Sequence, residues 1–149
     1  MARDEARDRA AISGLVLRYA ALVRDRNGGD CGNLFVDDAV YEIREIDPVQ
    51  PDMESRLRNR LEGSAVIADY VRQSATGPVR VYPLIHNLLV ELEDVGATAS
   101  CLMTTRTLPP GNEVFGRYDD VFAFRNDRWL FASRTYTILD APWMKVEMN

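Results

Sequence analysis

The 149-residue sequence contains one histidine, His86, and only two cysteines, Cys31 and Cys101. Two thiols far apart in a domain of this size do not form a disulfide framework, and without histidines beside them they do not indicate a zinc site. A single histidine also rules out the metal-binding set of two histidines and one carboxylate. We therefore expect two reduced, partly buried thiols, no bound metal and no cofactor.

The sequence also lacks an excess of positive charge and a long apolar run. Its 18 basic and 23 acidic residues give a net charge of −5 at pH 7, so no basic surface is available for nucleic acid or for an anionic membrane. No apolar run reaches the length of about 18 residues that a transmembrane helix needs. The early acidic residues Asp4, Glu5 and Asp8 are not typical of a signal peptide. We expect a cytoplasmic protein with no nucleic-acid or membrane partner.

The residues that are present have the composition of an ordinary globular domain, with 46% hydrophobic and 28% charged side chains. Apolar residues recur at steps of three and four over 4–24 and predict a helix there, which Gly28-Gly29 ends. A short second helix over 31–35 and a third helix capped by Ser64 are expected to follow.

Alternation with a period of two dominates the rest of the chain. The stretch 47–60 is expected to be irregular, with alternating arginines (Arg56, Arg58, Arg60) in a segment of the kind that often forms a lid or an assembly contact. Helices followed by a meander of strands are typical of an α+β fold, in which helices cover one face of a curved sheet and enclose a pocket. The predicted strands are 40–46, 81–93, 97–107, 114–124 and 129–139.

Polar side chains within apolar patterns are the candidate catalytic residues. We place His86 on the apolar face of the first long strand, where it is either a core residue held by one hydrogen bond or a proton carrier. A proton carrier needs a carboxylate to orient its ring, and Asp25 at the end of the first helix is the candidate, unless it belongs to an exposed charge run. Tyr19, on the buried stripe of that helix, is either a core tyrosine or a hydrogen-bond donor to a substrate oxygen.

Three further residues are candidates for substrate binding. Tyr41 lies in the first strand and allows the same two interpretations as Tyr19. Asp120 follows Tyr118 on an apolar face, where a carboxyl group either has a raised pKa and stays neutral or is paired with an arginine. With one histidine and no metal, the expected chemistry is a proton transfer, as in elimination, isomerisation or aldol-type cyclisation.

Six segments, in this order and spacing, resemble the SnoaL-like branch of the nuclear transport factor 2-like superfamily: AISGLVLRYAALV, LFVDDAVYE, GSAVIADYV, HNLLVELEDVGATAS, GRYDDVFAF and RWLFASRTY. The resemblance covers residues 10–139 and leaves 140–149 as the tail of a single domain, 1–149. It implies a cone-shaped α+β fold, in which three N-terminal helices pack on a strongly bent antiparallel sheet and enclose a pocket. It also implies a homodimer or a homotrimer.

The superfamily contains scytalone dehydratase, ketosteroid isomerase and polyketide cyclases, and also the small subunits of ring-hydroxylating dioxygenases, which carry out no chemistry. Similar dehydratases use a histidine and an aspartate as a dyad. His86 matches the histidine, whereas the aspartate position aligns with Arg24, next to Asp25. The resemblance to ketosteroid isomerase assigns Tyr19 and Asp120 to an oxyanion site.

We therefore expect a cofactor-independent lyase or isomerase of the dehydratase type. His86 would abstract a proton, Asp25 would orient it, and Tyr19 or Tyr41 would bind the oxygen, with a small cyclic or polyketide-like hydroxy-carbonyl molecule as the substrate. The alternative is a non-catalytic subunit that binds a small molecule or assembles with a partner, similar to the dioxygenase small subunits.

Overall fold

The computed structural model describes residues 3–74 and 76–144, and over these residues the chain forms two α-helices, two 3-10 helices and one six-stranded sheet. Residues 145–149 of the predicted tail lie outside the described residues. In chain order the elements are α1 (Glu5–Arg24), η1 (Gly28–Leu34), β1 (Phe35–Glu45), β2 (Arg56–Glu62), α2 (Ser64–Ser74), β3 (Arg80–Leu92), β4 (Ala97–Leu108), β5 (Phe115–Arg125), β6 (Arg128–Asp140) and η2 (Pro142–Met144).

The predicted boundaries agree with these elements except in three places. The second helix, predicted over 31–35, is the 3-10 helix η1 and spans Gly28–Leu34. The four long strands, β3 to β6, begin and end within one residue of their predicted limits. The first strand begins at Phe35 instead of residue 40. The segment predicted to be irregular contains β2, in which Leu61 alone is buried. β2 has little apolar alternation of its own. It forms a strand because it pairs with β1 in antiparallel orientation at an edge of the sheet.

Local signals in the sequence explain α1. The Asp4 carboxylate accepts a hydrogen bond from the Arg7 backbone N–H, so Asp4 is the N-cap of the helix. The acidic side chains of the first turn, Glu5 and Asp8, interact favourably with the positive end of the helix dipole. Ile12, Val16 and Tyr19 form the buried stripe, which packs toward the sheet.

The strand order of the sheet is β2-β1-β6-β5-β4-β3. After the β1–β2 hairpin the chain crosses through α2 to the opposite edge, and the meander from β3 to β6 returns to the centre. This crossover places β6 parallel to β1, so the prediction of a wholly antiparallel sheet is wrong at this one pair. All the other pairs of strands are antiparallel.

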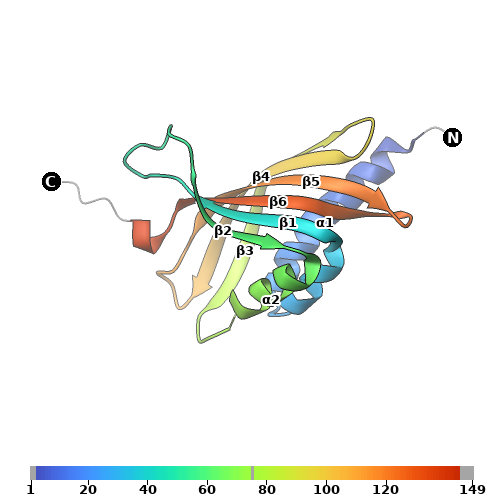
Figure 1. Cartoon of the computed structure of the whole chain (residues 1–149). Helices are drawn as coiled ribbons and strands as arrows, with labels where there is room; N and C mark the ends of the chain where they lie inside the picture. The colour runs from blue at the N-terminus through green and yellow to red at the C-terminus, as the bar shows by residue number, and fades with distance from the viewer. Residues whose placement is uncertain (1–2, 75, 145–149) are drawn as a thin grey trace.

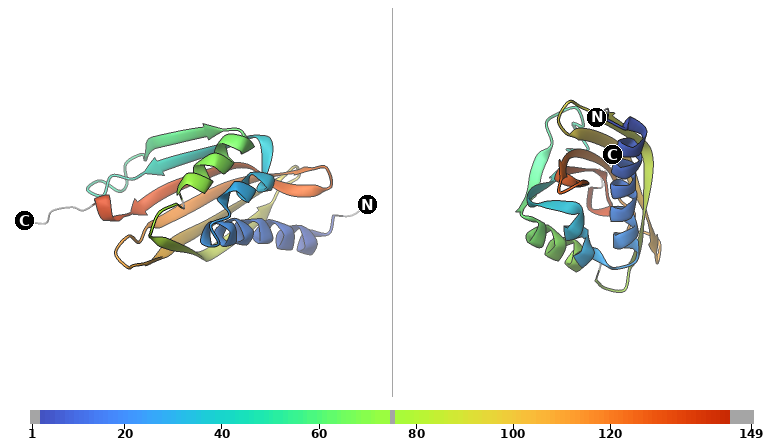
Figure 2. Two further views of the ribbon diagram at one scale, coloured as in Figure 1. Left: turned by 90° about the horizontal axis from the view of Figure 1, so that it is seen from below. Right: turned by 90° about the vertical axis from the view of Figure 1, so that its right-hand side faces the viewer.

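The sheet curls around the helices and stays open between its two edge strands (Figures 1 and 2). Both α-helices lie against the same concave face, with α1 along the side of β3 and α2 beside β1 and η1. The core between the helices and the sheet is aromatic at its centre, where Phe131 stacks on Phe35 and contacts the tilted ring of Phe122, both at a centroid distance of 4.9 Å. None of the helices within the described residues has the length and apolarity needed to cross a membrane.

Over the described residues, the strand pairing shifts register at five places, and β-bulges at three of them, in β2, β3 and β6, affect which side chains face the helices. In β2, Ile43 pairs with Asn59 and Arg44 with Leu57, so Arg58 is an extra residue. The same comparison of partners gives one extra residue between His86 and Leu89 in β3 and one extra residue, Ala132, in β6. A bulge shifts the alternation by one residue and therefore moves the following side chains to the other face.

Candidate functional site

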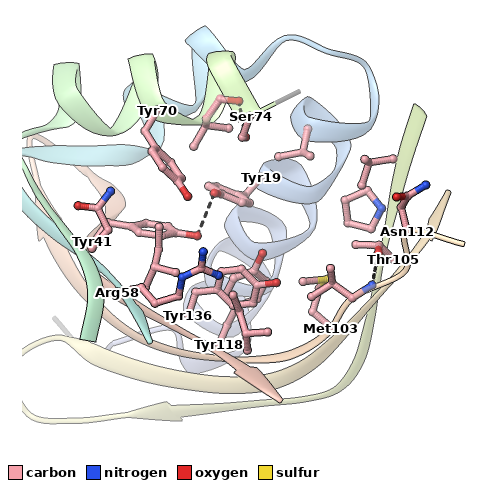
Figure 3. Close-up of a pocket in the computed structure, with 18 of the residues that line it drawn as sticks. Tyr19, Tyr41, Arg58, Tyr70, Ser74, Met103, Thr105, Asn112, Tyr118 and Tyr136 are labelled. Atoms are coloured by element: carbon pink, nitrogen blue, oxygen red, sulfur yellow. Dashed lines mark hydrogen bonds between the residues drawn. The ribbon is translucent and has the colours of Figure 1, made fainter. Parts of the chain in front are cut away.

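A cavity of about 510 Å³ lies between the concave face of the sheet and the helices α1 and α2. Every strand, both α-helices and η2 contribute to its lining, which is mainly apolar. Tyrosines are its most frequent polar component (Figure 3). Five of them line the cavity: Tyr19, Tyr41, Tyr70, Tyr118 and Tyr136.

Two of these phenols form a hydrogen-bonded pair. Tyr19 projects from α1 and Tyr41 from β1, and the Tyr19 hydroxyl donates to the Tyr41 hydroxyl at 3.3 Å (Figure 3). Both rings are buried. Because the Tyr41 oxygen accepts this bond, its own proton is directed elsewhere and can be donated to a ligand oxygen in the cavity.

Burial keeps the cavity phenols neutral. Desolvation raises the pKa of Tyr19 to about 12 and raises the pKa values of Tyr41 and Tyr118 well above their ordinary value. At neutral pH each phenol therefore carries its proton. The tyrosines are consequently suited to donating hydrogen bonds and are not suited to acting as bases.

A buried cation lies behind the phenols. Arg134 donates two hydrogen bonds to Asp120, at 2.8 and 3.1 Å, and both side chains are fully buried. The guanidinium carbon lies 3.6 Å from the centroid of Tyr118 and 4.4 Å from that of Tyr19. Its charge lowers the pKa of these phenols, against the larger upward effect of burial. The nearby cation therefore makes the phenols stronger hydrogen-bond donors. The Arg134 Nη1 atom is buried without a partner.

At the mouth of the cavity the lining is more polar. Arg58 and Asn59 come from β2, Asn112 from the loop before β5, and Trp143 from η2. Within the part of the chain that the structure describes, Arg58 is the one charged side chain that lines the cavity, and the lining contains no aspartate, glutamate or histidine. Its own groups therefore offer hydrogen-bond donors and one positive charge.

The structure brings three of the predicted site residues together in the cavity and places Asp120 behind them. Tyr19, Tyr41 and Tyr118 all line the cavity. Burial raises the pKa of Asp120, and the guanidinium of Arg134 opposes this shift. Of the two interpretations given for Asp120, the pairing with an arginine is the one observed.

His86 and Asp25 are not part of this site. The placement of His86 on the apolar face is wrong: its side chain is exposed and Nε2 lies 2.8 Å from the Thr104 hydroxyl. The bulge after His86, where Asn87 has a φ of 52°, turns Leu88 inward and leaves His86 outside. Asp25 does not contact His86 but pairs with Arg24 at 2.8 Å, with 59% of its side chain exposed. The predicted dyad is therefore not assembled.

Sequence reasoning missed Arg58, Tyr70 and Tyr136 as cavity residues. Tyr70 was recognisable only as part of the buried face of a helix, and a helical period does not distinguish a core position from a cavity wall. The inward direction of Tyr136 depends on Gly116, because a side chain there would collide with the tyrosine ring. Within the described residues no group of three His, Cys, Asp or Glu side chains could hold a metal ion.

The fold is shared with several solved structures. A variant of Rv3472 of Mycobacterium tuberculosis, a protein of unknown function, superposes with a TM-score of 0.72 at 18% identity, covering 91% of this chain and 73% of its own. A provisionally assigned scytalone dehydratase of Novosphingobium aromaticivorans gives a TM-score of 0.72 at 14% identity, with 94% and 89% covered. The β subunit of a provisionally assigned aromatic-ring-hydroxylating dioxygenase of the same organism gives 0.67 at 19% identity, with 93% and 95% covered.

At these identities the likeness establishes the architecture alone, which is the nuclear transport factor 2-like, or cystatin-like, fold. No curated protein matches the sequence. The model of one family, the SnoaL-like domain, matches residues 4–135. Because this match spans most of the chain, the protein belongs to the SnoaL-like domain family.

Proposed function

We propose that the cavity binds a small, mostly apolar molecule of the aromatic or polyketide-like hydroxy-carbonyl class. The Tyr41 hydroxyl, which accepts the Tyr19 proton, donates its own proton to the carbonyl oxygen of this molecule. The observation that carries this proposal is the pair of buried, neutral phenols, joined at 3.3 Å, within an apolar cavity. A ligand without an oxygen would leave the Tyr41 proton without an acceptor, which is costly in a desolvated site.

Such a pair also supports a class of chemistry. Donors that point at a carbonyl oxygen stabilise the negative charge that develops there when a neighbouring C–H bond is broken, and removal of one such donor commonly costs about 10²–10³-fold in rate. Dehydration of a hydroxy-carbonyl compound passes through this charge, and the phenols would stabilise it. The described residues of the lining include no carboxylate or imidazole that could accept the C–H proton, so the proposal gives the phenols this stabilising role alone. The likeness to the provisionally assigned scytalone dehydratase supports this reaction class. The proposal assigns no role to His86 or Asp25, since both lie outside the cavity.

Binding of 1-tetralone and of tetralin tests the proposal, because the two molecules differ in one carbonyl oxygen. Isothermal titration calorimetry should show that the protein binds tetralone about tenfold more tightly, the value of one buried hydrogen bond. Tyr41→Phe should abolish this preference. Tyr70→Phe, a change at a cavity phenol outside the pair, should preserve it. Equal affinities for the two probes in the unmodified protein would refute the proposal.

The alternative of an assembly subunit rests on the likeness to the dioxygenase β subunit and on the outer face of the sheet. Leu84, Leu89 and Val121 are exposed large apolar residues on this face. A homodimer or homotrimer formed through it stays a prediction, which the sedimentation velocity of the purified protein checks. Binding of tetralone would show that the cavity has a function of its own in either case.

A further inference from the structure

The alternating arginines of β2 do not share one face. A regular strand would direct Arg56, Arg58 and Arg60 to the same side. The bulge makes Arg58 the extra residue, so Arg58 and its neighbour Asn59 both line the cavity. Bulges commonly redirect a side chain in this way beside a functional site. Arg56, by contrast, lies outside the cavity with 76% of its side chain exposed.

The surroundings of Arg58 hold its guanidinium at the cavity mouth. Its guanidinium carbon lies 5.2 Å from the centroid of the Trp143 ring, so the arginine and the tryptophan pack together there. Its charge also lowers the pKa of Tyr70 and Tyr136, against the stronger effect of burial on both phenols. The guanidinium therefore acts on the cavity interior, and Figure 3 shows Arg58 among the side chains that line it.

The positive charge at the mouth is only partly neutralised. Arg58 pairs with Glu45 at 3.3 Å, and Arg56 lies 3.8 Å from the same carboxylate oxygen, so one carboxylate serves two guanidinium groups. With 41% of its side chain exposed, Arg58 has donors available for another acceptor. An arginine fork held by an aromatic ring is well suited to a carboxylate.

We propose that Arg58 binds a carboxylate on the ligand, so that the molecules recognised by this protein are aromatic or polyketide-like acids. The inference rests on the proposed function, because it adds an anionic end to the molecule whose carbonyl oxygen accepts from Tyr41 of the hydrogen-bonded pair. The apolar body of the ligand occupies the cavity, and its carboxylate lies at the mouth beside Arg58 and Trp143.

Titration with 2-naphthoate and 2-naphthamide tests this inference, because the two probes have the same shape and differ in charge. The unmodified protein should bind naphthoate about tenfold more tightly than naphthamide, and the preference should fall at high salt. Arg58→Gln should remove the preference by weakening the binding of naphthoate to the level of naphthamide. Arg58→Lys, which keeps the charge without the planar fork, should retain part of the preference. Arg60→Gln is the matched control and should leave the preference unchanged, because Arg60 pairs with Glu42 and Glu62 and does not line the cavity.

The outcomes separate the two proposals. If naphthoate keeps its advantage in Arg58→Gln, or has none in the unmodified protein, the carboxylate site is wrong, although binding of naphthamide would still support the cavity as a ligand site. If neither probe binds, the proposed function fails and the carboxylate site fails with it. Thermal unfolding of each variant verifies that the exposed substitutions leave the fold intact.

Discussion

Replacement of Asp120 by valine would leave the Arg134 guanidinium buried without its counter-charge. Both side chains are fully buried, and the two hydrogen bonds between them measure 2.8 and 3.1 Å. One nitrogen of the guanidinium already lacks a partner. Loss of the carboxylate would leave the aromatic rings of Tyr118 and Tyr19 as the main remaining stabilisation of the charge.

The magnitude follows from two opposing effects. Breaking a buried ion pair by removing one partner costs about 3–5 kcal/mol. The stacked rings remain in the variant and offset up to about 2 kcal/mol of this cost. We therefore expect Asp120→Val to lower the free energy of unfolding by about 3 kcal/mol, which for a chain of this length corresponds to a fall of roughly 6–12 °C in Tm.

A double variant tests whether the loss comes from the unpaired charge. Taking both charges out of water is costly, and a buried ion pair recovers this cost only in part, so an apolar pair of similar volume is often at least as stable. Replacing both partners, as Asp120→Val with Arg134→Met, should therefore restore most of the stability that the single variant loses. Urea unfolding followed by circular dichroism measures both. A single variant within about 1 kcal/mol of the unmodified protein, or a double variant no more stable than the single one, would refute this reasoning.

Two further predictions concern the packing of η1 and the start of α1. Gly28→Ala should lower the free energy of unfolding by about 1–3 kcal/mol, because its Cβ would lie 2.8 Å from the backbone of Val71 and Arg72. Gly29→Ala is the control and should cost less, because its Cβ would meet only the Arg72 side chain, at 3.9 Å. Equal losses for the two variants in urea unfolding would contradict the packing argument. Asp8 accepts hydrogen bonds from the Trp129 indole and from Arg3, and these bonds hold the pKa of its carboxyl below the ordinary value of 3.8. The Asp8 carboxylate therefore stabilises the folded protein above about pH 4, and this stabilisation is lost as the pH falls through the lowered pKa. The stability difference between the unmodified protein and Asp8→Asn should shrink from pH 7 to pH 3, and a difference independent of pH would show that this carboxylate is not linked to folding.

Much of the fold could be predicted because its signals are local. The helical period and the acidic N-cap define α1, and alternation with a period of two defines the limits of β3 to β6. The parallel pairing of β1 and β6 has no such signal, because it results from the crossover through α2. The edge strand β2 depends on its neighbour for its hydrogen bonds, so its own residues did not reveal it.

The site was predicted only where the strands are regular. Tyr41 and Tyr118 lie on the expected inward faces, and a buried phenol on α1 was recognisable from the helical period. A bulge costs one unpaired residue and has no reliable sequence signature, yet it moves every following side chain to the other face. The bulge in β3 therefore places the only histidine outside, and the bulge in β2 turns Arg58 into the cavity. The chemistry of the site changes accordingly, from a base oriented by a carboxylate to neutral phenols and one cation. In a curved sheet of this kind, the positions of the bulges decide which functional groups a ligand meets.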